Sequence, residues 1–96
     1  MKVELSDQVV AFVKRQAPEP RKRLRRALRN LATEKGDIIA LEGPLGGYHR
    51  LRVGAYRVIF AYTKTKRPSI RCLFAEKRGI VYTVFSQILQ RHVLRD

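Results

Sequence analysis

The sequence predicts an α+β fold in the order β-α-α-β-β-β-α, with two N-terminal helices packed on one face of a mostly antiparallel sheet. Two early segments have apolar residues at helical spacing, three alternating runs follow, and a helical pattern closes the chain. These segments span residues 7–17, 20–35, 48–53, 56–63, 70–76 and 80–93. A chain of 96 residues has room for one core, so residues 1–96 are expected to form a single domain.

The N-terminal part predicts a strand followed by a pair of helices. MKVEL alternates like an edge or central strand, and Ser6 is suited to cap the helix that follows. Pro18 ends this first helix, Pro20 fits the first turn of the second, and Gly36 suits its C-terminal end. The first helix carries its apolar residues at Val9, Val10, Val13 and Ala17, and the second at Leu24, Ala27, Leu28 and Leu31. Two helices joined by a proline-containing turn predict an αα-hairpin on the sheet.

The middle of the chain is expected to be irregular before the strands begin. Residues 36–47, GDIIALEGPLGG, contain four glycines and a proline, which disfavour regular structure. Ile38, Ile39 and Leu41 are expected to tuck under the domain. The closing helix presents its apolar residues at Val81, Val84, Phe85 and Ile88.

The register of the hairpin around Gly54 follows from its turn. A two-residue loop with glycine first suits a type II′ turn, which pairs Val53 with Tyr56 and Arg52 with Arg57. Side chains then alternate between two faces. The core face collects His49, Leu51, Val53, Tyr56, Val58, Phe60 and Tyr62, and the open face Tyr48, Arg50, Arg52, Arg57, Ile59 and Ala61. The next strand is expected to point Ile70, Cys72 and Phe74 inward, and Arg71, Leu73, Ala75 and Lys77 to the open face.

Arg52 directly opposite Arg57 is a like-charge pair, which destabilises a sheet by up to about 1 kcal/mol. This cost favours an anion-binding surface on the open face over a merely solvated one. Tyr48 offers a ring there on which a base could stack. The candidate RNA-binding residues are Tyr48, Arg52, Arg71, Lys77, Arg25 and Arg29.

The net charge is the outlying property of the composition. Twenty-one Lys and Arg oppose eight Asp and Glu, which gives +13 at neutral pH. So high a charge repels itself unless a polyanion or an acidic partner neutralises it, although a solvated basic surface is the simpler alternative. The basic helix segment RKRLRRALRN, which includes Arg25 and Arg29, could bind ribosomal RNA phosphates or an acidic protein, or remain solvated.

Other classes of protein are disfavoured by what the sequence contains. No apolar run is long enough to cross a membrane, and the N-terminus does not read as a signal peptide. A single cysteine, Cys72, excludes an internal disulfide, and with two histidines it makes a zinc site improbable. The chain is therefore expected to work in the reducing cytoplasm, without metal or cofactor.

The segment LEGPLGGYHRLRVGAYRVIFAY, followed by FAEKRGIVYTVF, resembles the RelE/ParE superfamily of bacterial and archaeal toxins from toxin–antitoxin pairs. The resemblance covers nearly the whole chain and implies a compact microbial-ribonuclease-like α+β fold. RelE-like members cleave mRNA in the ribosomal A site, where the 2′-hydroxyl attacks the adjacent phosphate. ParE-like members poison DNA gyrase without such chemistry. Both kinds are neutralised by an acidic antitoxin, and the toxin alone is expected to be a monomer.

The resemblance also implies residue roles. Arg57 matches the family arginine held near the scissile phosphate, Arg50 a basic position on the preceding strand, and Arg78 the basic residue after the last strand. Tyr82 matches a tyrosine that orients or stacks on the RNA. Arg50, Arg57, Arg78 and Tyr82 are thus the candidate catalytic residues. Tyr48 departs from the family pattern, because some relatives carry a lysine there.

The group that transfers protons is left open. Arginine stays protonated, so the candidates are Glu76, which stands where some relatives have a basic residue, His92 near the end of the chain, and His49, which the register directs to the core. The function expected from the sequence is a ribosome-dependent endoribonuclease toxin. A non-enzymatic gyrase inhibitor and a plain RNA-binding module are the alternatives.

Overall fold

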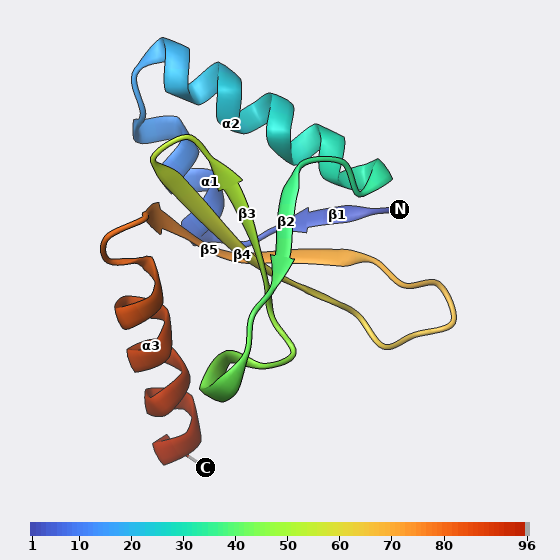
Figure 1. The fold of residues 1–96 in the computed structure, drawn as a ribbon, viewed down its shortest axis with the longest axis vertical. Coiled ribbons are helices and arrows are strands. Elements are labelled where there is room, and N and C mark those ends of the chain that lie inside the picture. The colour runs from blue at the N-terminus through green and yellow to red at the C-terminus, as the bar shows by residue number, and fades with distance from the viewer. Residues whose placement is uncertain (96) are drawn as a thin grey trace.

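The computed structural model describes the backbone of residues 1–95 and the side chains of residues 1–91 (Figure 1). This part of the chain forms a five-stranded sheet in the order β1-β5-β4-β3-β2. β1 (Val3–Leu5) runs parallel to β5 (Ile70–Lys77), and all other neighbours are antiparallel. The other elements are α1 (Asp7–Arg15), α2 (Pro18–Asn30), β2 (Asp37–Ala40), β3 (His49–Val53), β4 (Tyr56–Tyr62) and α3 (Val81–Arg95), with 3₁₀ turns at Leu31–Thr33 and Gly43–Leu45.

The α+β class and the two N-terminal helices on one face are confirmed. Ser6 caps α1 as predicted, because its hydroxyl accepts a hydrogen bond of 3.2 Å from the backbone of Val9. α2 begins at Pro18 rather than Pro20. The left-handed residue after the helical segment is Glu34, with φ of +55°, and not Gly36.

The irregular connection predicted for residues 36–47 is wrong in its first part, which forms the edge strand β2. Its backbone pairs with β3, so that Ile38 lies opposite Leu51 and Asp37 opposite Arg52. Ile38 packs against the core as expected, whereas Ile39 on the other side of the strand is half exposed. Two β-branched residues after Gly36 suit a strand, and their pairing satisfies the outer backbone groups of β3.

The main core lies between the helices α1 and α2 and one face of the sheet. Its buried residues are Val9, Phe12, Val13, Leu24, Leu28, Leu31, Leu51, Val53, Val58, Phe60, Ile70, Cys72 and Ala75. The hairpin register is confirmed at every predicted pair, from Val53 with Tyr56 to His49 with Phe60. Gly54 takes φ of +58° as the first turn residue, which glycine adopts without strain.

A β-bulge on β5 changes which of its residues face the helices. Ile59 pairs with Phe74 and Phe60 with Cys72, so Leu73 is an extra residue on β5. The alternation predicted for this strand therefore holds as far as Leu73, which packs against the second face, and is wrong from Phe74 onward. Ala75 enters the main core, while Phe74 turns to the opposite face. Lys77 lies opposite Tyr56 on the helix face, and Glu76 moves to the face of Arg57.

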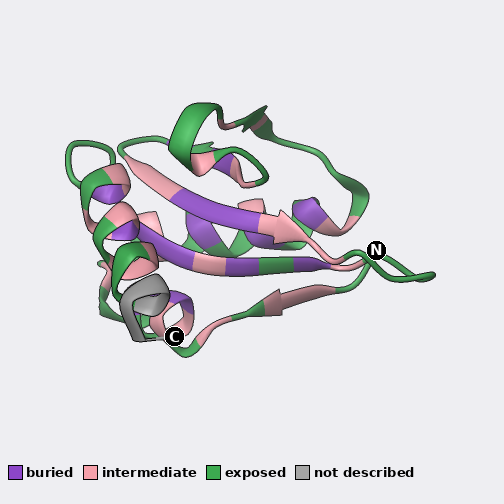
Figure 2. Cartoon of the chain, turned by 90° about the horizontal axis from the view of Figure 1, so that it is seen from below, coloured by how far each residue is buried: buried purple, intermediate pink, exposed green. Residues whose placement is uncertain are grey.

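The second face of the sheet is not fully open, because α3 covers part of it (Figures 1 and 2). Ile59 and Phe74 form a smaller core with Val81 and Phe85 of α3, and the rings of Phe74 and Phe85 stack 6.2 Å apart. The second face, which the sequence analysis expected to be open, is therefore partly covered by α3. The end of the sheet beside the Gly54–Ala55 turn remains accessible on this second face, where Arg52 is exposed and Arg57 and Glu76 are half-buried.

Candidate active site

Four charged residues form a row across the second face of the sheet, one from each of four adjacent strands. Asp37 lies opposite Arg52, Arg52 opposite Arg57, and Arg57 opposite Glu76. We call these four residues the charged row. Paired residues in a sheet share a face and lie close enough to interact, so the row places two guanidinium groups between two carboxylates.

The two arginines of the row are held by different acceptors. Arg52 Nε lies 2.6 Å from Asp37 Oδ2, which makes a charge-assisted contact. Arg57 turns toward the hairpin turn instead, where its Nη1 donates to the carbonyl oxygens of Gly54 at 2.8 Å and Tyr56 at 2.9 Å. The like-charge pair predicted from the sequence is therefore present, and each member has its own partner.

Glu76 differs from Asp37 in its contacts, because it accepts a backbone hydrogen bond and forms no ion pair with a described side chain. Its Oε1 accepts a hydrogen bond of 2.9 Å from the backbone N–H of Lys77, and it makes no ion pair with any residue whose side chain the structure describes. The carboxylate is half-buried and stands across from Arg57. The row thus contains one carboxylate occupied by arginine and one that is not.

Arg78 and Tyr82 are brought to the same end of the sheet. The backbone N–H of Arg78 donates to the carbonyl oxygen of Ala55 at 2.9 Å, which ties the end of β5 to the hairpin turn. The backbone N–H of Ile80 donates to the carbonyl oxygen of Lys77 at 3.1 Å, and α3 begins at the next residue, Val81. Tyr82, in the first turn of α3, packs half-buried against the second core.

Arg23 of α2 also lies at this turn, which the sequence did not indicate. One of its guanidinium nitrogens is 2.9 Å from where a β-carbon on Gly54 would stand. The guanidinium groups of Arg23 and Arg57 therefore both lie beside Gly54, and the backbone of the exposed Arg78 contacts the same turn at Ala55. A cluster of this kind favours binding of an anion such as a phosphate.

Arg50 is not on an open surface, contrary to the sequence prediction. Arg50 is only 8% exposed. It lies on the second face between Ile39 and the fully buried Ile59. Its Nη2 is 3.7 Å from Asp37 Oδ1, while its buried Nε has no hydrogen-bond partner among the described residues. The burial follows from the second core, which closes the centre of this face.

Tyr48 and His49 are both engaged in aromatic packing. Tyr48, expected as an open platform for a base, packs edge-to-face against Phe85 at 5.1 Å and is partly buried. His49 points to the core face as predicted, where it stacks on Phe60 at 5.4 Å and meets Tyr62 edge-on at 4.9 Å. The side chain of His92 lies outside the described residues.

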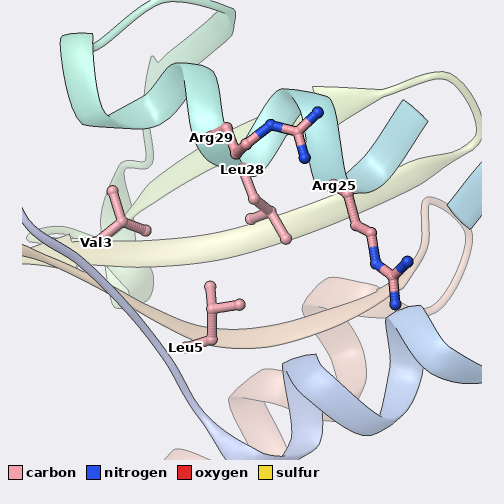
Figure 3. Close-up of a pocket in the computed structure, with 5 residues that line it drawn as sticks. All are labelled: Val3, Leu5, Arg25, Leu28 and Arg29. Carbon is pink, nitrogen blue, oxygen red and sulfur yellow. The ribbon is translucent and has the colours of Figure 1, made fainter. Parts of the chain in front are cut away.

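The remaining candidate RNA-binding residues lie away from the charged row. Arg71 pairs with Glu4 of the edge strand β1, with Nε and Oε2 3.2 Å apart. Lys77 belongs to the helix face rather than the predicted open face. Arg25 and Arg29 project from α2 at the rim of a cavity of about 270 Å³ between α2 and β1 (Figure 3). Of the six predicted RNA-binding residues, only Arg52 belongs to the row.

The described part of the chain offers little other reactive chemistry. No group of three or more His, Cys, Asp or Glu side chains in it could hold a metal ion. Burial raises the pKa of Cys72 to about 12, so this thiol stays protonated at neutral pH. No helix among the described residues is both long and apolar enough to cross a membrane.

Comparisons with known proteins agree with this architecture. No family model and no curated protein sequence matches the chain. Among solved structures, RelE in the archaeal RelE–RelB complex of Pyrococcus horikoshii OT3 is 30% identical, with a TM-score of 0.62 over 81% of this chain and 94% of that chain. The Methanococcus jannaschii RelB–RelE complex matches with 22% identity and a TM-score of 0.63, over 82% of this chain and 94% of that chain. The YoeB/ParE toxin of Agrobacterium tumefaciens matches with 15% identity and a TM-score of 0.66, over 81% of this chain and 99% of that chain.

The fold is thus that of a small basic α+β toxin with arginines on one face of its sheet. At 30% identity over nearly the whole of the archaeal relative, the chain belongs to the RelE/ParE superfamily, the toxins of type II toxin–antitoxin systems. The resemblance inferred from the sequence is confirmed at this level.

Proposed function

We propose that this toxin is a ribosome-dependent endoribonuclease that cleaves mRNA in the A site. The observation that supports the proposal most is the placement of Arg57, whose guanidinium is fixed at the hairpin turn, opposite Arg52 and at the turn that Arg23 and the backbone of Arg78 also reach. Tyr82 stands at the same end of the sheet, where its ring can support a nucleotide. The RNA contact is proposed for this end alone, and no cofactor is required.

The chemistry follows from what fixed guanidinium groups can do. Attack of a 2′-hydroxyl on the adjacent phosphate places extra negative charge on the phosphorus oxygens. Arg57, which its two carbonyl contacts already orient, stabilises that charge without reorganisation. Arg78 adds a second positive group at the solvent-exposed side. Since positioning of the RNA supplies much of the acceleration, the ribosome is expected to hold the mRNA in the geometry for attack.

An acidic antitoxin is the proposed inhibitor. Two structural relatives are RelE–RelB complexes, and the charge of +13 favours a partner of opposite sign. The cavity between α2 and β1 fits an acidic amphipathic segment, since its floor is Val3, Leu5 and Leu28 and its rim is Arg25 and Arg29 (Figure 3). The toxin alone is proposed to be a monomer that acts in the cytoplasm, where its ribosomal target is found.

The test is to add purified protein to a translation reaction and to map mRNA ends by primer extension. New 5′ ends at A-site codons, absent on naked RNA, are the expected result. Binding to ribosomes without new ends would instead favour a non-catalytic RNA-binding module. Intact mRNA with normal translation would contradict both ribosomal functions.

Gyrase inhibition is the second candidate, and the burial of Arg50 and Tyr48 favours it. These two residues, expected to contact RNA, are partly or fully covered by the second core, which leaves fewer groups for RNA contact. A supercoiling assay with purified gyrase tests this alternative. Loss of supercoiling at protein concentrations that leave translation unaffected would support it over mRNA cleavage.

A further inference from the structure

Attack by the 2′-hydroxyl requires a group that accepts its proton, and the charged row contains one such group. Arginine cannot serve, because it stays protonated. His49 points into the core face between Phe60 and Tyr62. Asp37 is occupied by Arg52 at 2.6 Å and lies 3.7 Å from Arg50. Glu76 is the carboxylate of the row that no described arginine or lysine holds.

We propose that Glu76 accepts the proton of the attacking 2′-hydroxyl, an inference that rests on the proposed endoribonuclease function. Glu76 lies directly across from Arg57, so an RNA phosphate bound by Arg57 would bring its neighbouring ribose toward this carboxylate. The hydrogen bond from the backbone of Lys77 fixes one carboxylate oxygen. The second oxygen remains available for the hydroxyl.

The bulge at Leu73 is what puts Glu76 in this position. Without the extra residue, the strict alternation of β5 would direct Glu76 to the helix face and Lys77 toward Arg57. The bulge therefore places the carboxylate of Glu76, rather than the ammonium group of Lys77, on the face of Arg57. Bulges commonly re-aim a side chain next to a functional site.

The 2′-hydroxyl gives its proton to the carboxylate of Glu76 while its oxygen forms a bond to phosphorus. The bond from phosphorus to the leaving 5′-oxygen breaks, and that oxygen takes a proton from water. Glu76 then releases its proton to the resulting hydroxide, so the protein is unchanged and the product is a 2′,3′-cyclic phosphate.

The charged or titratable groups nearest to Glu76 belong to the charged row and to the residues that follow Glu76 in the chain. Arg57 faces it from β4, with Arg52 and Asp37 further along the row on β3 and β2. Lys77 and Arg78 follow it in the chain, and Tyr82 stands at the start of α3. Because a proton acceptor must be deprotonated to act, substitution of Glu76 should change the pH dependence of cleavage and not merely its rate.

The experiment measures single-turnover cleavage by wild type, Glu76→Gln and Glu76→Asp on purified ribosomes programmed with mRNA, over a series of pH values. Wild type is expected to cleave more slowly toward acidic pH, and Glu76→Gln is expected to cleave roughly 10²–10⁴ times more slowly than wild type and to lack this decline. Glu76→Asp should recover part of the rate together with the decline. Glu19→Gln, which removes an exposed carboxylate of α2, is the matched control and should behave as wild type.

Binding and stability separate a chemical role from a structural one. Binding of all variants to ribosomes carrying mRNA with a 2′-deoxy nucleotide at the attacking position should be unchanged within about twofold. If Glu76→Gln cleaves with the rate and pH profile of wild type, the role assigned to Glu76 is overturned, while the proposed endoribonuclease function stands. A slow variant with an unaltered pH profile and a lowered melting temperature would overturn it too, in favour of a structural role. Absence of cleavage by wild type itself would instead overturn the proposed function on which the assignment rests.

Discussion

Arg52 and Arg57 lie directly opposite each other on neighbouring strands, and each guanidinium group contacts an oxygen acceptor of its own. Arg52 contacts Asp37 of the edge strand, while Arg57 turns back onto the carbonyl oxygens of the hairpin turn. The carboxylate of Asp37 offsets the positive charge of Arg52, and the carbonyl contacts draw the guanidinium of Arg57 toward the turn. Both contacts reduce the repulsion expected of two like charges. The arrangement leaves Arg57 oriented by the backbone, which makes it the residue most suited to hold a phosphate.

Arg57→Ala is expected to abolish the proposed activity while the fold persists. Loss of one preorganised donor to a developing negative charge typically costs roughly 10²–10³-fold in rate. Arg57 is partly exposed and outside both cores, so its removal leaves the packing intact. The measurements are primer extension on a translated mRNA and circular dichroism of the purified variant.

The control for Arg57→Ala is Arg67→Ala, which removes the same charge from the exposed loop between β4 and β5. It should cleave as wild type does. An Arg57→Ala protein that remained toxic at wild-type expression would exclude the mechanism. Equal loss of activity in both variants would mean that net charge, rather than this guanidinium, is what matters.

Asp37→Asn is expected to destabilise the protein by about 1–3 kcal/mol, because it removes the carboxylate beside the buried Arg50. Arg50 already has a buried Nε without a described partner, so it depends on the negative charge of Asp37. The free energy of unfolding is measured by urea titration. Glu4→Gln, which breaks the more exposed pairs with Arg71 and Lys2, should cost less than about 1 kcal/mol. Equal effects of the two substitutions would show that Arg50 is not stabilised by Asp37.

Much of the fold could be predicted from local patterns. The hairpin register came from a glycine at the first turn position, and the cap of α1 from a serine ahead of an amphipathic run. β2 was missed because the glycines around it obscured the alternation of Asp37, Ile38 and Ile39, although two adjacent isoleucines after Gly36 are a strand signal. The bulge at Leu73 could not be predicted, since it depends on how β5 pairs with β4.

The candidate site was predicted in part. The opposition of Arg52 and Arg57 followed from the hairpin register alone. Asp37 and Arg23 joined the site through pairing or packing between elements distant in the sequence, which no local pattern reveals. Glu76 was a candidate from the sequence, but its place opposite Arg57 depends on the bulge. Arg50 was expected on an open surface because the packing of α3 against this face was not foreseen.

Gly54→Ala is expected to destabilise the protein by about 1–2 kcal/mol, because φ of +58° is unfavourable for a residue with a β-carbon. The new β-carbon would also stand 2.9 Å from a guanidinium nitrogen of Arg23, which must move. Gly79→Ala is the control, since nothing lies within 4 Å of its added carbon and its φ is not positive. Thermal melting should show a clear loss for Gly54→Ala and little change for Gly79→Ala. Similar melting temperatures for both variants would contradict the turn assigned to Gly54.

The buried thiol of Cys72 is expected to make stability depend on alkaline pH. Burial raises its pKa from 9.0 to about 12, so the folded protein holds the proton more tightly than the unfolded chain does. This contribution to stability is complete below pH 9, where the thiol is protonated in both states. It declines as the pH rises from 9 toward 12, because the unfolded chain then loses its proton first.

Cys72→Ala isolates this effect from the titration of lysines and tyrosines, because both proteins share those groups. The free energy of unfolding of wild type should fall more steeply than that of Cys72→Ala between pH 9 and 11, by about 1–3 kcal/mol over the interval. Iodoacetamide should label Cys72 slowly in the folded protein and rapidly in urea, since the residue is 1% exposed. Parallel pH curves for the two proteins, or fast labelling of the native state, would show that the thiol is accessible to solvent.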